Sequence, residues 1–386
     1  MYVYLIAFLV STTLFKCGDF FKEKNRWIVD ALGILLLCMV AGFRGISVGT
    51  DVSVYLRPSI DAAMYANNFV EYWHASWMPP NGYRLMEISQ FEFGYTLLIW
   101  IVTKLFHSIV MTQLVVELFI IYPIYFVLRK AKNTSVWIGM LTFELLFFNT
   151  SLNMIRQSMA VAIGFVAFFY WLNNDKIKFL FFTFVACFFH KSAVILLLIV
   201  GLYEFLYSKN YLNYQRRSKI LKLEYSSYRL LILSVIGICA ILGIRYLSYL
   251  LKFIGLGQYS TYVTKASFLP NQILYYLPGL VLLMINWKVY KQTIIGYKFY
   301  ILMIIYAILA SQFYTESTVL SANQYGGRIA LYFSMFQILA YAQAFKKIRY
   351  KYSLLFVLII YMSFYWWYHY AFLGIDMTVP YAFINY

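Results

Sequence analysis

Long apolar runs recur along the whole chain and are separated by short polar segments. A helix that crosses a bilayer needs about 20 apolar residues, with a lower limit of about 17. Lipid offers the backbone no hydrogen bonds, so such runs are expected to be helical. The pattern predicts an all-α fold, a multi-pass membrane helical bundle that forms a single integral membrane domain over residues 1–386. About 12 transmembrane helices are expected, several near or below the short limit, over residues 2–16, 27–43, 109–128, 134–149, 156–172, 177–190, 192–207, 229–247, 271–287, 299–313, 328–345 and 353–370.

One additional apolar run, residues 94–106, does not fit the alternation of the others. Its roughly 13 residues rise only about 20 Å as a helix, which is less than the ~30 Å core of a bilayer. If this run crossed the membrane, every later loop would change sides. We therefore expect an amphipathic or re-entrant helix on the outer side, within a long outer loop, residues 44–108, between the second and third spans.

The composition favours a membrane protein over a soluble one. Of the 386 residues, 63% are apolar and 12% are charged, a balance that a soluble core cannot absorb. The formal net charge of +17 would suit a nucleic-acid partner, but 22 of the 32 Lys and Arg residues fall in one alternating set of loops. By the positive-inside rule these loops, including a basic loop at residues 208–228, are cytoplasmic. Both termini are then expected outside, and no nucleic-acid partner is expected.

The chain gives no sign of processing, disulfides or metal binding. It begins directly with an apolar run and has no small-residue cleavage site, so no removable signal peptide is expected. The four cysteines are scattered singly and form no C-x-x-C or Cys/His cluster. The sequence therefore predicts no disulfide framework, no metal site and no cofactor.

Arginine is concentrated on the outer side, where positive charge is not needed for orientation. Six of the ten basic residues predicted there are arginines, against six of the 22 cytoplasmic ones. The planar guanidinium binds phosphate or carboxylate through two parallel hydrogen bonds, so the bias indicates an anionic ligand. Polar clusters also fall at four predicted outer helix ends, at residues 44–51, 149–157, 190–191 and 323–328.

Arg156 and Arg328 each fall at the predicted start of a helix that runs inward. Helix N-termini present free N–H groups and partial positive charge, which favour an anion. Two acids within the spans, Glu117 and Glu144, lie near the same level and can pair with the arginines or orient them. Taken alone, each polar cluster is better explained by an ion pair or an exposed turn than by a ligand site. The coincidence of four clusters on one face favours a ligand site.

Several short motifs between residues 44 and 332 resemble those of the EpsG family and come in the family's order. They are Arg44-x-x-x-Val48-Gly-Thr-Asp-x-x-x-Tyr55, Glu92-x-Gly94-Tyr, Asn153-x-Ile155-Arg-Gln-x-x-Ala160, Phe189-His-x-Ser192-Ala, and Arg328 with Tyr332. The tyrosine that often follows the Gly-Thr-Asp triplet is Val52 here. Members of this family are Wzy-like polymerases of bacterial exopolysaccharide, capsule and O-antigen.

The resemblance implies a membrane glycosyltransferase of GT-C-like architecture that needs no metal. Its donor and acceptor would both be undecaprenyl-diphosphate-linked oligosaccharide repeat units. The growing chain would move from its lipid carrier onto a hydroxyl of the next unit, at the periplasmic face of the bacterial inner membrane. Membrane lipid is an implied partner, and a chain-length regulator is a further candidate partner. The resemblance does not decide between lipopolysaccharide O-antigen, capsule and free exopolysaccharide.

Site roles follow from the chemistry of such a transfer. Without a metal ion, arginines must stabilise the charge that builds on the departing diphosphate, and Arg156, Arg328 and Arg44 are the candidates. His190 titrates near neutral pH and suits the base that takes the acceptor proton, with Asp51 as the competing candidate. Asn153 and Gln157 are expected one helical turn apart, where they can bind sugar hydroxyls. The full predicted substrate-binding set is Asn153, Gln157, Asn149, Tyr55 and Glu92.

Two other functions compete with this prediction. A flippase or transporter of the same lipid-linked oligosaccharide would also use twelve spans. It should, however, show polar groups near mid-membrane, often at broken helices, whereas the polar clusters here lie on the outer side. An O-acetyltransferase would need an acyl donor delivered across the membrane. A purely structural membrane protein would not explain the arginine bias.

Overall fold

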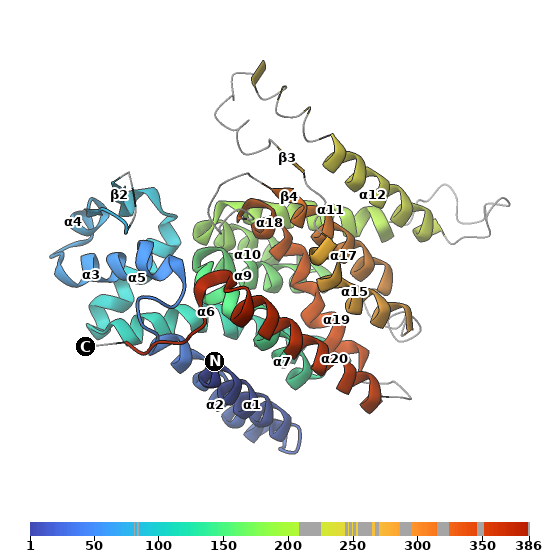
Figure 1. Ribbon diagram of the computed structural model, residues 1–386, viewed down its shortest axis with the longest axis horizontal. Helices are drawn as coiled ribbons and strands as arrows, with labels where there is room; N and C mark the ends of the chain where they lie inside the picture. Colours follow the sequence, from blue (N-terminus) through green and yellow to red (C-terminus); the bar gives the residue numbers. More distant parts are fainter. Residues whose placement is uncertain are drawn as a thin grey trace. The chain divides into compact units, whose positions relative to one another are not determined.

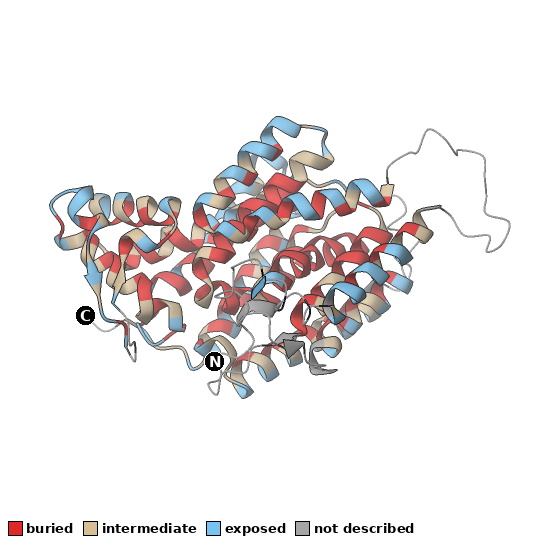
Figure 2. Cartoon of the chain, turned by 90° about the horizontal axis from the view of Figure 1, so that it is seen from above, coloured by how far each residue is buried: buried red, intermediate tan, exposed pale blue. Residues whose placement is uncertain are grey.

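The computed structural model is helical apart from two short hairpins, within the residues that it describes (Figure 1). These are residues 1–80, 82, 85–207, 225–243, 246, 249, 252–253, 265–266, 270–285, 295–314, 324–345 and 351–384. The contacts divide the chain into two compact units, residues 1–194 with 352–386 and residues 195–351. Each unit has its own buried apolar residues. Figure 2 shows the buried residues in red along the helices.

The first unit contains eight helices that correspond to predicted membrane spans. They are α1 (Tyr2–Gly18), α2 (Glu23–Gly42), α6 (Ile109–Lys130), α7 (Val136–Leu146), α8 (Phe148–Asn153), α9 (Ile155–Leu172), α10 (Lys176–Phe189) and α20 (Lys351–Trp366). A π-helical stretch, Trp367–Phe372, continues α20, and a short 3₁₀ turn, Lys191–Val194, follows α10. In α9, 72% of the residues are buried, which makes it the central helix of this unit.

The predicted outer loop is mostly ordered secondary structure. It contains a π-helical turn (Val52–Leu56), α3 (Arg57–Tyr65), α4 (Phe69–Trp73), a hairpin of β1 (Ser76–Trp77) and β2 (Met86–Glu87), a 3₁₀ turn (Ile88–Gln90) and α5 (Phe93–Phe106). The 14 residues of α5 rise about 21 Å, in keeping with the predicted short helix at residues 94–106. Lys104 near its end donates to the carbonyl of Ala66 at 2.5 Å, which ties α5 to the end of α3.

The second unit contains the remaining described helices. They are α11 (Ile195–Tyr207), α12 (Tyr225–Leu242), α15 (Pro270–Ile285), α17 (Tyr297–Ser311), α18 (Gln324–Ser334) and α19 (Phe336–Ala344), with a small hairpin of β3 (Lys265–Ala266) and β4 (Phe313–Tyr314). Most of the predicted basic loop 208–228 lies outside the described residues, because α12 is described from Tyr225.

Every predicted apolar run coincides with helix in the described residues, but two runs divide. Residues 134–149 form α7 and the start of α8, and residues 328–345 fall on α18 and α19. Four described helices are long and apolar enough to cross a membrane by length and composition, namely Glu23–Gly42, Ile109–Lys130, Ile155–Leu172 and Tyr352–Phe372. The number of about 12 crossings and the GT-C-like arrangement remain predictions.

Two fully buried acids join helices of the first unit. Glu144 of α7 accepts hydrogen bonds from Ser11 and Thr12 of α1, both at 2.7 Å. Glu117 of α6 accepts one from Ser151 of α8 at 2.7 Å and lies 3.8 Å from Arg44. The expectation that these acids pair with outer arginines is therefore confirmed for Glu117 and wrong for Glu144, because the hydroxyls of α1 occupy both Glu144 oxygens.

Gly94 allows α5 to approach the end of α10. A Cβ at this position would lie 2.8 Å from the carbonyl oxygen of Phe188, closer than side chains approach backbone. We expect Gly94→Ala to destabilise the protein by about 1–3 kcal/mol, seen as a lower apparent unfolding temperature. Gly201→Ala in α11 is the matched control, because nothing lies within 4 Å of its added Cβ. Equal unfolding temperatures for the two variants would contradict this close packing.

Candidate active site

Arg156 is held in one position at the start of α9, as the sequence predicts. It is the second residue of the helix, and its Nη1 lies 2.5 Å from Oε2 of Glu92. Its guanidinium carbon lies 4.8 Å from the ring centres of both Tyr55 and Phe91. About a fifth of the side chain, 20%, remains exposed. A charge fixed by an acid and two aromatic rings is preorganised for an anionic ligand and can still be reached by one.

Glu92 connects Arg156 to the turn between α10 and α11. Its second oxygen lies 3.5 Å from the backbone N–H of Lys191. The structure thus brings together three sequence motifs that lie far apart along the chain, those around residues 92, 156 and 190. Lys191 itself is exposed, so the turn adds a positive charge near Arg156.

The ring of His190 caps this turn. Its Nδ1 lies 2.6 Å from Oγ of Ser192 and accepts the backbone N–H of Ser192 at 3.3 Å. A ring nitrogen that accepts an N–H carries no hydrogen, so the neutral ring holds its hydrogen on Nε2. In this tautomer the remaining ring nitrogen is a hydrogen-bond donor. The geometry suits His190 for donating to an oxygen better than for accepting a proton.

The Tyr55 side chain contacts both Asp51 and Arg156 and so places Asp51 near Arg156. The Tyr55 hydroxyl donates to Oδ2 of Asp51, while its ring packs under the guanidinium. Asn153 fixes the backbone here, because its Oδ1 accepts from the Thr50 hydroxyl at 2.7 Å and the Asp51 N–H at 3.2 Å. Gly49 has a φ of +89°, and a Cβ there would meet an α8 carbonyl oxygen at 2.8 Å. The Gly-Thr-Asp triplet therefore docks directly on α8.

Asp376 completes this cluster, and sequence reasoning missed it. Its Oδ1 accepts from Nδ2 of Asn153 at 3.0 Å, and its Oδ2 accepts from the Thr150 hydroxyl at 2.7 Å. Burial raises the pKa of Asp376 above its ordinary value, although both hydrogen bonds oppose the shift. The available signal was that Asp376 is the single acid in residues 352–386. The local sequence pattern could not show that the C-terminal segment around Asp376 packs against α8.

The C-terminal tail is anchored by polar groups that would otherwise be buried without partners. The amide of Asn149 donates to Thr378 at 2.8 Å and accepts from the indole of Trp366 at 2.6 Å. The Tyr4 hydroxyl donates to the carbonyl of Thr378 at 2.7 Å. Asn149, predicted to bind substrate, is fully buried in this anchor. Its observed contacts are structural.

Arg44 is fully buried, as is its partner Glu117. Its Nη1 lies 3.8 Å from the nearer Glu117 oxygen, and its guanidinium nitrogens make no hydrogen bond within the described residues. Burial lowers the pKa of Arg44, and Glu117 opposes that shift. A ligand can reach this group only if the packing around it opens.

Two predicted placements need correction. Asn153 and Gln157 do not lie on one helix, because the chain breaks at Met154 (φ −87°, ψ 59°) between α8 and α9. Arg328 is not the first residue of its helix, because α18 begins at Gln324 and places Arg328 one turn inside. Gln157 is buried within α9, and Arg328 is half-buried in the second unit.

The described residues contain no group of three or more His, Cys, Asp or Glu side chains that could hold a metal ion. The cluster around Arg156 instead offers two carboxylates, Asp51 and Asp376, on either side of Asn153. Such a set can bind hydroxyl groups, exchange a proton and stabilise an anion.

A comparison with known families identifies the family of this chain. The EpsG family profile matches residues 27–386, nearly the whole chain. The chain belongs to the EpsG family. It is therefore a membrane protein of polysaccharide biosynthesis, in a family associated with Wzy-like polymerase activity. No curated protein and no solved structure matches it.

The raised pKa of Asp376 predicts that docking of the tail depends on pH. A carboxyl whose pKa is raised in the folded state stabilises that state below its ordinary pKa of 3.8 and loses the contribution as pH rises through the raised value. Hydrogen exchange should therefore show the Gly45 and Gly49 amides, which donate to tail carbonyls, better protected at low pH. Asp376→Asn should remove this dependence, with Asp19→Asn as the control. An unchanged pH profile in Asp376→Asn would contradict the assignment.

Proposed function

We propose that this EpsG-family protein is a Wzy-like polysaccharide polymerase. It joins undecaprenyl-diphosphate-linked oligosaccharide repeat units on the outer, periplasmic side of the bacterial inner membrane, by glycosyl transfer that needs no metal. The observation that carries the proposal is the fixed, partly exposed Arg156 at the N-terminus of α9. The Asp51 carboxylate lies nearby, because Tyr55 contacts both side chains. A phosphate-binding group and a proton-accepting group are the two components that this transfer requires.

In the proposed reaction the acceptor hydroxyl oxygen forms a bond to the anomeric carbon of the growing chain. The bond between that carbon and the carrier phosphate breaks, and its electron pair stays on the diphosphate oxygens. Arg156 stabilises this charge, helped by the N-terminal N–H groups of α9 and by Lys191. Arg328, in the second unit, stays a candidate from the sequence alone. Arg44, paired with Glu117 inside the protein, holds the loop after α2 in place.

The acceptor proton goes to a carboxylate in this proposal. Asp51 and Asp376 both lie beside Asn153, and the raised pKa of Asp376 makes it a stronger base than an ordinary carboxylate. His190 donates from Nε2 to a diphosphate oxygen and so acts in binding. Sugar hydroxyls are bound by the amides and carboxylates around α8 and α9, among them Asn153, Gln157 and Glu92.

A flippase for the same lipid-linked oligosaccharide is the alternative function. The observation that favours it is the broken helix at Met154, since transporters often bind substrate at such breaks. The polar groups at this break, however, bind the loop after α2 and the C-terminal tail rather than lining a path across the protein.

Arg156 tests the polymerase proposal. In cells that lack this gene, wild-type protein should restore a full surface-polysaccharide ladder, and Arg156→Ala should leave a single-repeat band. Arg156→Lys keeps the charge but loses the planar fork, so polymerisation should fall by about 10²–10³-fold. Arg129→Lys, in the last turn of α6, is the control. Loss of even the single repeat from the surface would support the flippase instead, and a full ladder in Arg156→Ala would refute the role of this residue.

The proton-accepting group is tested by three isosteric changes. Asp51→Asn and Asp376→Asn should each lower the rate of polymerisation, by about 10²-fold or more for the group that takes the proton. His190→Asn should keep most of the activity, because its amide oxygen can replace Nδ1 as the acceptor for the Ser192 N–H. Protein levels in membranes serve as the control. Full activity in both Asp variants, with loss in His190→Asn, would assign the base to His190.

A further inference from the structure

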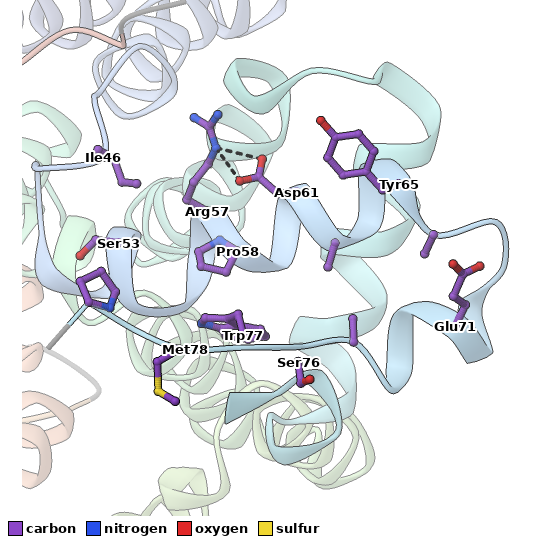
Figure 3. Close-up of a pocket in the computed structure, with 14 residues that line it drawn as sticks. Ile46, Ser53, Arg57, Pro58, Asp61, Tyr65, Glu71, Ser76, Trp77 and Met78 are labelled. Carbon is purple, nitrogen blue, oxygen red and sulfur yellow. Dashed lines mark hydrogen bonds and ion pairs between the residues drawn. The ribbon is translucent and has the colours of Figure 1, made fainter. Parts of the chain in front are cut away.

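An open groove of about 700 Å³ lies against α3 in the first unit, outside the cluster around Arg156. Figure 3 shows Arg57, Asp61 and Tyr65 along one rim and Trp77, Ser76 and Met78 along the other, with Pro58 between them. Ala62, Ala66 and Ala75 also line it and leave the space open because their side chains are small. A volume of this size falls in the ordinary range of ligand sites.

We propose that this groove binds the glycan of the growing polysaccharide chain, and so extends the proposed polymerase site outward. The inference rests on the proposed function. It assigns a second, separate task to the outer segment of residues 46–80: retaining the chain between successive transfers.

Trp77 provides a rigid aromatic surface in this groove. Its indole N–H donates to the carbonyl of Val54 at 2.9 Å, and its ring stacks on Phe91 with centres 5.8 Å apart and an interplanar angle of 18°. Both contacts fix the ring before any ligand arrives. Pyranose sugars present an apolar C–H face that packs on such rings, while their hydroxyls remain available at the edge. Tyr65, which is 85% exposed, adds a second aromatic side chain.

Polar groups at the rim match the hydroxyl edge of a sugar. Nε of Arg57 lies 3.0 Å from Asp61, and the pair keeps part of each side chain exposed, 29% and 41%. A surface ion pair of this kind stabilises a fold little, so its exposed donors and acceptors remain open to a ligand. Together they offer a hydroxyl group both a donor and an acceptor, beside an aromatic surface.

One aromatic ring, Phe91, connects the groove lining to the candidate active site. Phe91 packs against Trp77 on the groove side and against the Arg156 guanidinium on the other, with centre distances of 5.8 Å and 4.8 Å. A chain whose terminal sugar is held at Arg156 by its diphosphate would therefore meet the groove with the sugars that follow. A membrane lipid is the rival occupant, because Ile46 and Met78 on the lining are exposed apolar groups that could contact its acyl chains. Charges of both signs on the lining favour the glycan.

The test measures binding of glycan without its carrier to the purified full-length protein in nanodiscs. The probe is the polysaccharide released from the producing cells by mild acid, and binding is followed by saturation-transfer NMR and titration calorimetry. Wild type and Arg156→Ala should both bind, since the probe carries no diphosphate. Tyr65→Ala and Asp61→Asn should each weaken binding about tenfold. Tyr65 is exposed and Asp61 is half-exposed, so neither change should prevent folding, unlike Trp77→Ala.

Two control variants and one functional readout complete the test. Tyr2→Ala and Glu23→Gln remove an exposed tyrosine and an exposed acid away from the groove, and they should bind as wild type does. In cells, the groove variants should shorten the modal chain length while single repeats are still consumed, whereas Arg156→Ala should stop polymerisation. Unchanged glycan binding in both groove variants would overturn the inference and leave the polymerase proposal intact. An absence of glycan binding by wild type would also overturn the inference. So would groove variants that bind lipid vesicles more weakly but bind the glycan as wild type does.

Discussion

The Asn153 side chain is the contact on which the candidate site depends. Its oxygen binds the loop after α2, and its nitrogen binds the C-terminal tail, so one amide joins segments from both ends of the chain to the break between α8 and α9. Helix ends expose unpaired backbone and side-chain polar groups, which are costly inside a membrane protein unless they bind one another. Here the break supplies those groups, and the two distant segments satisfy them.

The same constraint explains how charge is distributed in the first unit. Glu117 and Arg44 neutralise each other where neither is exposed, and Glu144 is satisfied by two hydroxyls. Arg156 differs, because its acid and its aromatic neighbours leave part of it exposed. Burying a pair contributes little net stability, whereas a fixed and accessible charge contributes to ligand binding. The fully buried Arg44 is therefore structural, whereas the partly exposed Arg156 is the candidate for ligand binding.

In the proposed function, the segment of residues 46–80 connects the transfer reaction to the retention of the growing polymer. Phe91 contacts both Arg156 and Trp77, so a single ring lies between the anion site and the groove lining. In a polymerase that transfers the whole chain at each step, the donor must stay attached while a new unit arrives. A fixed aromatic surface binds successive sugars without requiring one sequence of hydroxyl groups, which suits a chain that moves through the site.

The sequence by itself determined the membrane class, the approximate positions of most described helices, the family motifs and the place of Arg156 at the start of α9. These features are local, because hydrophobic runs and helix ends are set by neighbouring residues. Only the tertiary structure decided that Glu117 pairs with Arg44, that Glu144 binds α1, that α8 and α9 are separated at Met154, and that Asp376 joins Asn153. Such pairings depend on which helices become neighbours, and hydrophobic periodicity carries no information about polar partners more than 200 residues apart, as Asn153 and Asp376 are.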